Sequence, residues 1–323
     1  MKTRSMSISM SILINSNTIK PSYFNFIKSD SIEIFCPFIT TDIIREIVDK
    51  SLDITRIITR WKLSDFEEGY ADLDLYDLCQ LNNIDLYINP RVHLKAAIRN
   101  RNHVFISSAN ITGKGLNFVT DDIHNYELSS VISIKGIQDL IYFEKIVQDS
   151  VYVSESVFEE IKKEVENLDH NRVSEPEELY NMEDKAYYIS KLPQSSSLSL
   201  LFEYYNETVK DYSDEDYNCA VHDLSIFDVS EGLNYEEFIE ELSQSFFNHP
   251  FINGLIGEVK KDGYIYFGRV KEWIQNNCLD VPVPNRRELT GNVKVLYKWI
   301  EVLGKGKFEV DRPHHSQRIK VLG

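Results

Sequence analysis

Short apolar runs alternate with amphipathic stretches through the first 150 residues of this 323-residue chain, and this order constrains the fold most. The runs are rich in β-branched residues and are short, so they predict strands. The predicted strands are residues 31–38, 54–61, 84–88, 92–98, 103–108 and 127–134. Residues 41–52 and 64–82 have the spacing of helices. This order predicts an α/β domain whose mixed sheet has about six or seven strands and is flanked by helices.

The pattern changes twice after residue 150. Residues 151–233 combine a helical start with a polar stretch rich in Glu, Ser and Tyr, and we interpret them as a helical linker region. Residues 234–323 show helical patterns followed by a hairpin pattern with Pro313 near its turn. Three helices followed by a β-ribbon is the order of a winged helix. We therefore expect an α/β domain at 1–150, the linker region at 151–233 and a winged-helix-like α+β domain at 234–323.

The cysteines and the hydropathy pattern indicate where the protein works. The four cysteines lie far apart without a C-x-x-C pair, which argues against a disulfide framework or a zinc knuckle. They are typical of buried thiols in a reducing compartment. Serines interrupt the apolar residues at 1–15, so this segment predicts a strand and not a signal peptide. No stretch approaches the roughly 20 apolar residues of a membrane-spanning helix. We therefore expect a cytoplasmic protein that does not enter the membrane.

The charge is divided unevenly along the chain. The net charge is −16, which argues against a protein that coats nucleic acid with its whole surface. Residues 281–323 hold nine Lys or Arg and four Asp or Glu, a net charge of +5, so residues 1–280 carry −21. A basic C-terminal segment thus follows an acidic body.

Four polar residues in the first domain have a spacing that suggests a phosphate site. His93 and Lys95 lie two residues apart on a predicted strand, and Ser108 and Asn110 have the same spacing on or just beyond the next one. Residues two apart on a strand project from the same face. The short polar connection at 99–102 predicts that the two strands are antiparallel neighbours. The four side chains are therefore expected to converge on one patch.

This set of groups suits the cleavage of a phosphodiester without a metal or another cofactor. An imidazole can attack phosphorus and form a covalent phosphohistidine. A lysine ammonium and an asparagine amide can hold the non-bridging oxygens and stabilise the charge of the transition state. A lone histidine on a strand is more often structural, but the three partners of His93 favour the catalytic interpretation.

These residues resemble the motif of the phospholipase D superfamily, which is H-x-K, four residues, D, six residues, G-S-x-N. This chain reads His93-Leu-Lys95, four residues, Asn100, six residues, Ser107-Ser108-Ala109-Asn110. Asn100 thus replaces the family aspartate and Ser107 the glycine. The flanking runs at 88–91 and 111–116 are similar to the nuclease-like branch of the family, which includes metal-independent restriction endonucleases. The resemblance covers roughly residues 25–150.

The resemblance implies further features of the site. Similar proteins place a carboxylate on the strand after the motif, where it holds the histidine ring, and by position this would be Glu127. The reaction of the family needs two histidines, one as nucleophile and one as general acid. No other histidine of this chain begins a second H-x-K. We therefore expect a homodimer in which His93 of both subunits forms one active site across a two-fold axis.

Several basic residues are candidates for contact with DNA. Arg60, at the end of a predicted strand, could steer phosphate toward the site, and Lys114 lies in a glycine-bracketed run after the motif. In the C-terminal domain the candidates lie on the predicted long helix and on the hairpin, as the recognition helix and wing of a winged helix would. These are Arg286, Arg287, Lys294, Lys298, Arg312 and Arg318. Many winged helices instead dock proteins, and that alternative stays open.

The leading hypothesis from the sequence is a homodimeric, metal-independent DNA endonuclease of the phospholipase D-like class. The resemblance alone implies a defence or restriction role. One alternative is a non-cleaving protein on a degenerate fold that binds nucleic acid or a helicase or ATPase partner, which Asn100 favours. Another is a lipid phosphodiesterase, but the chain has no amphipathic membrane-binding stretch, and the basic C-terminal segment would have no role.

Overall fold

The computed structural model describes residues 13–28, 31–50, 53–118, 124–168, 184–280, 282–313 and 316–322. The chain divides into two compact units. The first unit comprises residues 1–135 and 149–180, and the second comprises residues 136–148 and 181–323. These bounds do not coincide with the domain bounds expected at residues 150 and 233. Residues 136–148 were expected in the first domain, but they belong to the second unit.

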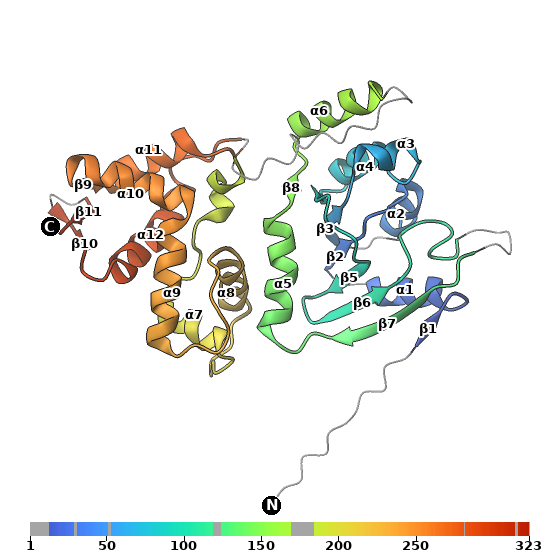
Figure 1. Ribbon diagram of the computed structural model, residues 1–323, viewed down its shortest axis with the longest axis horizontal. Coiled ribbons are helices and arrows are strands. Elements are labelled where there is room, and N and C mark those ends of the chain that lie inside the picture. Colours follow the sequence, from blue (N-terminus) through green and yellow to red (C-terminus); the bar gives the residue numbers. More distant parts are fainter. Residues whose placement is uncertain are drawn as a thin grey trace, which may run out of the picture. The chain divides into compact units, whose positions relative to one another are not determined.

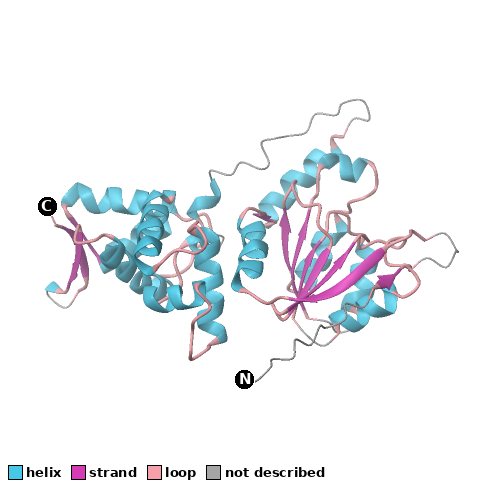
Figure 2. Ribbon diagram, turned by 60° about the horizontal axis from the view of Figure 1, so that its bottom comes forward, coloured by secondary structure: helices cyan, strands magenta, loops and turns pink. Residues whose placement is uncertain are grey.

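The first unit is built on a mixed sheet that has eight strands among the described residues (Figures 1 and 2). The strands are β1 (Ile14–Asn15), β2 (Ile32–Phe35), β3 (Ile54–Thr59), β4 (Asp85–Ile88), β5 (Ala96–Arg99), β6 (His103–Ser107), β7 (Leu128–Ser133) and β8 (Val151–Tyr152). Their order in the sheet is β1-β7-β6-β5-β2-β3-β4-β8. β2, β3 and β4 are parallel to one another, and the other pairs are antiparallel. The predicted α/β fold with a mixed sheet is confirmed.

Helices pack against this sheet, and their apolar side chains help to form the core of the first unit. They are α1 (Ile19–Ile27), α2 (Thr41–Val48), α3 (Leu63–Glu67), α4 (Asp74–Leu81) and α6 (Glu155–Glu166). One face of the sheet supplies Ile34, Ile57, Leu86, Ala97 and Phe105 to the same buried cluster as the apolar sides of these helices. Burial of such side chains is the main favourable contribution to folding. The cluster therefore holds the central strands in place beneath the candidate site.

The helix predicted at residues 64–82 is wrong in one respect, because the structure has two short helices there. α3 ends at Glu67, and Gly69 follows with a φ of 73°. That conformation is accessible to glycine at little cost. The Asp65 carbonyl accepts hydrogen bonds from the backbone N–H groups of Tyr70 and Ala71. The chain is thus turned away from the axis of α3 before α4 begins.

The second unit is mainly helical and ends in a small sheet (Figure 2). Its helices are α5 (Ile137–Gln148), α7 (Leu198–Tyr205), α8 (Asp214–Ile226), α9 (Tyr235–Asn248), α10 (Pro250–Asp262), α11 (Phe267–Asn277) and α12 (Leu289–Leu303), with 3-10 turns at Asp184–Tyr187 and Ile189–Lys191. The sheet has the order β10 (Phe308–Asp311), β11 (Arg318–Val321), β9 (Tyr264–Tyr266) and is antiparallel. The predicted hairpin is confirmed.

Residues 184–226 are not the linker that their polar composition suggested. Phe202 and Tyr205 of α7 pack against Phe238 of α9, with ring centroids 5.2 and 4.9 Å apart. The Asp223 side chain on α8 is fully buried and accepts hydrogen bonds from the backbone N–H groups of Gln194 and Ser195 at 2.8 and 2.7 Å. Aromatic packing and this buried carboxylate build the segment into the second unit.

Candidate active site

The H-x-K segment lies just before a strand and not on it, which corrects the prediction of a strand at 92–98. β5 begins at Ala96, where its pairing with Phe35 of β2 starts. Lys95 still continues the pairing toward β6, because its carbonyl accepts the Ser107 N–H at 3.0 Å. The Lys95 ammonium donates to the His93 carbonyl at 3.2 Å. The His93 side chain is exposed and makes no hydrogen bond within the described residues.

The S-x-N segment follows β6 directly, as expected, and β5 and β6 are antiparallel neighbours as predicted. Ser108 extends the ladder toward β7. Its N–H donates to the Leu128 carbonyl at 3.0 Å, and its hydroxyl accepts the Leu128 N–H at 3.0 Å. The end of β6 is therefore held from both sides, by the H-x-K segment and by β7.

Glu127 lies at the start of β7 and is joined to Ser108. Its carboxylate accepts hydrogen bonds from the Ser108 hydroxyl and, at 3.2 Å, from the Asn125 amide. Its backbone N–H donates to the Ser16 hydroxyl at 2.6 Å. No hydrogen bond joins Glu127 to the His93 ring in the part of the chain that the structure describes. Glu127 thus fixes Ser108, and the bond to histidine that the resemblance implies is not formed.

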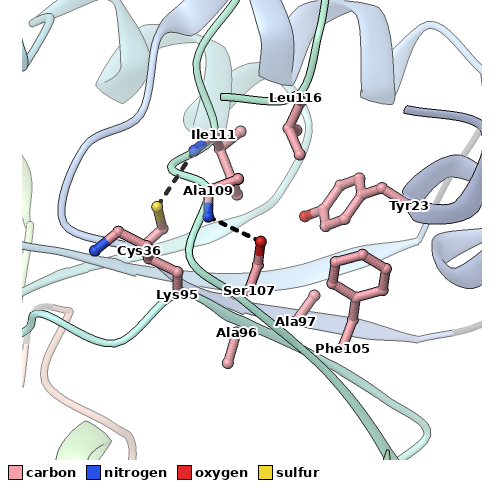
Figure 3. Close-up of a pocket in the computed structure, with 10 residues that line it drawn as sticks. All are labelled: Tyr23, Cys36, Lys95, Ala96, Ala97, Phe105, Ser107, Ala109, Ile111 and Leu116. Carbon is pink, nitrogen blue, oxygen red and sulfur yellow. Dashed lines mark hydrogen bonds between the residues drawn. The ribbon is translucent and has the colours of Figure 1, made fainter. Parts of the chain in front are cut away.

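Asn110 contacts a residue that the sequence did not single out, Cys36. This cysteine follows the last residue of β2, and its thiol lies 3.7 Å from the Asn110 side-chain oxygen. The Cys36 sulfur also accepts the Ile111 N–H at 3.4 Å (Figure 3). Burial raises the pKa of this thiol to about 11, although hydrogen bonds and the charge of Lys95 oppose the shift. No sequence signal identifies Cys36, because only the tertiary fold brings β2 beside the motif.

A small cavity lies beneath these segments (Figure 3). It holds about 10 Å³, which is room for a single water molecule. Its walls include Tyr23, Cys36, Lys95, Ser107 and Ala109. The Tyr23 hydroxyl points into this space and has no hydrogen-bond partner within the described residues. The floor of the site is thus not completely packed, and it holds one buried hydroxyl without a partner among the described residues.

The loop after the motif folds back onto Asn110. The Leu116 N–H donates to the Thr112 carbonyl at 3.0 Å, and the Phe118 N–H to the Gly113 carbonyl at 2.8 Å. A Cβ at Gly115 would lie 2.4 Å from the Asn110 carbonyl oxygen. The glycine-bracketed run therefore lets the backbone approach Asn110 closely. Lys114 in this run is exposed and makes no ion pair within the described residues.

The two departures from the family motif have structural roles away from phosphate chemistry. Asn100 lies at the end of β5 opposite Lys95, and Asn100 and Arg101 have φ values of 49° and 53°. Two positive φ values are what a type I′ hairpin turn requires, and asparagine tolerates them well. The Asn100 side-chain oxygen accepts the Ser31 N–H at 3.2 Å. The Ser107 hydroxyl lies 2.7 Å from that of Ser129 and accepts the Ala109 N–H.

The other basic candidates differ in their exposure and in their ion-pair partners. Arg60 forms a two-pronged ion pair with the buried Asp65, so it stabilises the fold instead of facing phosphate. Arg318 pairs with Asp311 in the same way. Arg286 and Arg287 lie in the turn before α12 and not on it, which corrects their placement. Arg286 approaches Glu272 at 4.0 Å.

The exposed group comprises Arg287, Lys294, Lys298 and Arg312. Lys294 and Lys298 lie one turn apart on α12, and Lys298 donates to the Ser196 carbonyl at 3.4 Å. Lys294 and Arg287 have no ion-pair partner within the described residues. The two histidines that follow Pro313 at the predicted hairpin turn, His314 and His315, lie outside the described residues.

The described residues contain no group of three or more His, Cys, Asp or Glu side chains that could hold a metal ion. None of their helices is long and apolar enough to cross a membrane.

Comparison with known proteins finds likeness only among solved structures, because no protein-family model and no curated protein matches the chain. NucT from Helicobacter pylori is 18% identical with a TM-score of 0.34, over 44% of this chain and 98% of that one. Nuc from Salmonella typhimurium, a phospholipase D family member, is 15% identical with a TM-score of 0.29, over 48% and 91%. A phosphatidylserine synthase from Haemophilus influenzae is 16% identical with a TM-score of 0.33, over 48% and 42%. Likenesses this distant assign no activity to this chain.

Proposed function

We propose that this protein is a metal-independent phosphodiesterase that cleaves DNA as a homodimer. The proposal is based on the close approach of the two half-motifs, which are the H-x-K segment at 93–95 and the S-x-N segment at 108–110. The Ser107 N–H donates to the Lys95 carbonyl, so the H-x-K and S-x-N segments lie side by side at one end of β5 and β6. The His93 side chain is exposed here and makes no hydrogen bond within the described residues. An unengaged imidazole beside a lysine and an asparagine suits attack on a phosphate.

In the proposed reaction His93 is the nucleophile. Its ring nitrogen attacks phosphorus, the bond from phosphorus to the leaving oxygen breaks, and a phosphohistidine forms. Lys95 and Asn110 hold the non-bridging oxygens and stabilise the charge that develops on them. Ser108 is fixed by Glu127 and Leu128 and supports the loop that carries Asn110. In a second displacement water attacks the same phosphorus, the bond from phosphorus to the histidine nitrogen breaks, and the phosphorylated DNA end is released.

The general acid in this scheme comes from a second subunit. The leaving oxygen needs a proton, and the chain has one H-x-K segment. His93 of the partner subunit would supply the proton in the first step and accept one from water in the second. A two-fold axis near the site gives both subunits this arrangement.

DNA would be held in part by the winged-helix-like C-terminal region. Among its candidate residues, the exposed side chains of Arg287 and Lys294 are better placed for phosphate than Arg318, which is paired with Asp311. Contacts of this kind add affinity without sequence preference. A restriction or defence role, a helicase or ATPase partner and a cytoplasmic setting belong to the same proposal.

The main alternative, a non-cleaving protein on a degenerate fold, loses its best support. It rested on Asn100 in place of the family aspartate. Asn100 occupies a hairpin turn at the other end of β5, and its side chain bonds the Ser31 backbone. The substitution is therefore explained by turn geometry and gives no reason to expect an inactive site.

The test is cleavage of supercoiled plasmid in EDTA by the wild type, His93→Ala and His103→Ala. His103 lies at the far end of β6 from Ser108 and is the matched histidine control. Cleavage in chelator by the wild type and His103→Ala, with none by His93→Ala, is the expected result. Strict dependence on Mg²⁺ would refute the mechanism.

The dimer is tested separately by mixing the wild type with excess His93→Ala. A shared site predicts that activity falls with the square of the wild-type fraction. A linear fall would show that each chain acts alone.

A further inference from the structure

The thiol of Cys36 occupies a position between the two half-motifs. It follows β2, the strand that pairs with β5 on one side and β3 on the other. Its own N–H donates to the Ile58 carbonyl at 3.0 Å, so its backbone is anchored in the sheet. The segment after Cys36 is bonded to the loop that carries Asn110, because the Thr40 N–H donates to the Ile111 carbonyl at 3.0 Å. The thiol is therefore a fixed group against which the loop can be oriented.

The contacts of the thiol define the orientation of the Asn110 side chain. The sulfur accepts the Ile111 N–H at 3.4 Å, and its single proton faces two acceptors, the Phe38 carbonyl at 3.3 Å and Asn110 Oδ1 at 3.7 Å. The Asn110 amide oxygen faces Cys36, which leaves the two N–H donors of this amide for another group.

The surroundings of this thiol include a small cavity and two polar side chains. The cavity beside it has room for about one water molecule. The Tyr23 side chain is 3% exposed, and its hydroxyl points into the cavity without a partner in the described part of the chain. Most of the cavity wall is apolar, but the Cys36 thiol also faces the side chain of Asn110, a proposed phosphate-binding residue.

We infer that Cys36 is a positioning residue, which orients the Asn110 amide so that its N–H donors face the phosphate. The inference rests on the proposed function for its effect on cleavage. The orientation of Asn110 is a property of the structure that can be measured without cleavage. Cys36 itself touches neither the phosphate nor His93 in this scheme.

The matched control is Cys79 on α4. Cys79 is fully buried in the same apolar cluster as Cys36, and its thiol has no hydrogen-bond partner within the described residues. Burial raises the pKa of Cys79 to about 12. Replacement of either cysteine by alanine removes one sulfur from the same core. Only the change at Cys36 also removes a contact with Asn110.

The experiment compares Cys36→Ala, Cys36→Ser and Cys79→Ala, each with and without Asn110→Ala. Plasmid cleavage gives kcat and KM, thermal melting gives stability, and NMR follows the side-chain amide resonances of Asn110. Cys36→Ala is expected to lower kcat about five- to tenfold, the value of one hydrogen bond. Cys36→Ser, which keeps a donor and an acceptor, recovers part of this loss. Cys79→Ala leaves kcat and the Asn110 resonances unchanged.

The double variant decides whether the effect passes through Asn110. If Cys36 acts by orienting Asn110, then Cys36→Ala adds no further loss of kcat in the Asn110→Ala background. A full additional loss there, or an equal loss in Cys79→Ala, would overturn the inference while the phosphodiesterase proposal stands. If the wild type cleaves nothing, the proposed function fails, and the Asn110 resonances alone test the inference about Cys36. Unchanged Asn110 resonances in Cys36→Ala would then overturn the inference.

Discussion

The close approach of Gly115 to Asn110 predicts a large effect from one added methyl group. In Gly115→Ala the new Cβ would lie 2.4 Å from the Asn110 carbonyl oxygen, whereas ordinary contact begins at 3.4 Å. The loop must therefore open by about 1 Å, and a misplacement of that size costs on the order of 100-fold in rate. Crowding of this kind also lowers the free energy of unfolding, by about 1–3 kcal/mol.

The assay for Gly115→Ala is kcat/KM for plasmid cleavage in EDTA, at a temperature where melting curves show both proteins folded. Gly257→Ala is the control, because Gly257 is exposed on α10 and a Cβ there meets nothing within 4 Å. That control should keep full activity and gain about 1 kcal/mol of helix stability. Cleavage by Gly115→Ala within about threefold of the wild type would refute the reasoning, since it would show that Asn110 tolerates the shift.

Three further predictions concern the turn, a buried histidine and the basic surface. Asn100→Asp should leave the melting temperature and cleavage unchanged. Asn100→Ala should lower the free energy of unfolding by about 1–2 kcal/mol, because alanine disfavours a positive φ. Equal melting temperatures for the two variants would contradict the turn assignment. His222 lies 2.9 Å from Asp223 and 2.6 Å from the Ser190 carbonyl through its two ring nitrogens. Burial alone would lower the pKa of His222, but the hydrogen bond and charge of Asp223, with Ser190 and Glu144, raise it. A raised folded pKa stabilises the protein below the unfolded value of about 6.5, and this contribution is lost as pH rises through the folded pKa. Urea unfolding at a series of pH values should show that loss in the wild type and not in His222→Gln, and identical profiles would count against it. Lys294→Ala should weaken binding to all DNA sequences and reduce by about one the slope of log binding constant against log salt concentration, whereas Arg318→Ala should lower the melting temperature. Fluorescence anisotropy at several salt concentrations measures the slope for Lys294→Ala. An unchanged slope would exclude a contact of Lys294 with phosphate.

The local features of the first unit were predictable from the sequence because short-range patterns determine them. The runs of β-branched residues became strands β2 to β7, since β-branched side chains favour an extended backbone. The polar connection at 99–102 predicted a hairpin, and its two positive φ values at Asn100 and Arg101 confirm a tight turn. The spacing of His93, Lys95, Ser108 and Asn110 predicted two adjacent segments, and the Ser107 to Lys95 hydrogen bond joins them.

Other features depended on contacts that no local pattern records. Residues 184–226 are polar in composition, but a few aromatic side chains and the buried Asp223 pack them into the second unit. Arg60 looked available for phosphate until the fold placed it against Asp65. The strand at β5 begins only at Ala96, because pairing with Phe35 of β2 sets its first residue.

The sequence by itself determined the half-motif and its single occurrence, because both are matters of residue identity and spacing. Only the tertiary structure brought Cys36 and Tyr23 beneath that motif, and Cys36 lies 74 residues before Asn110 in the chain. Parallel and antiparallel pairing around β2 decides which side chains meet there. The chemical groups of the candidate site thus lie in one short stretch of sequence, while the packing that orients these side chains comes from the whole sheet.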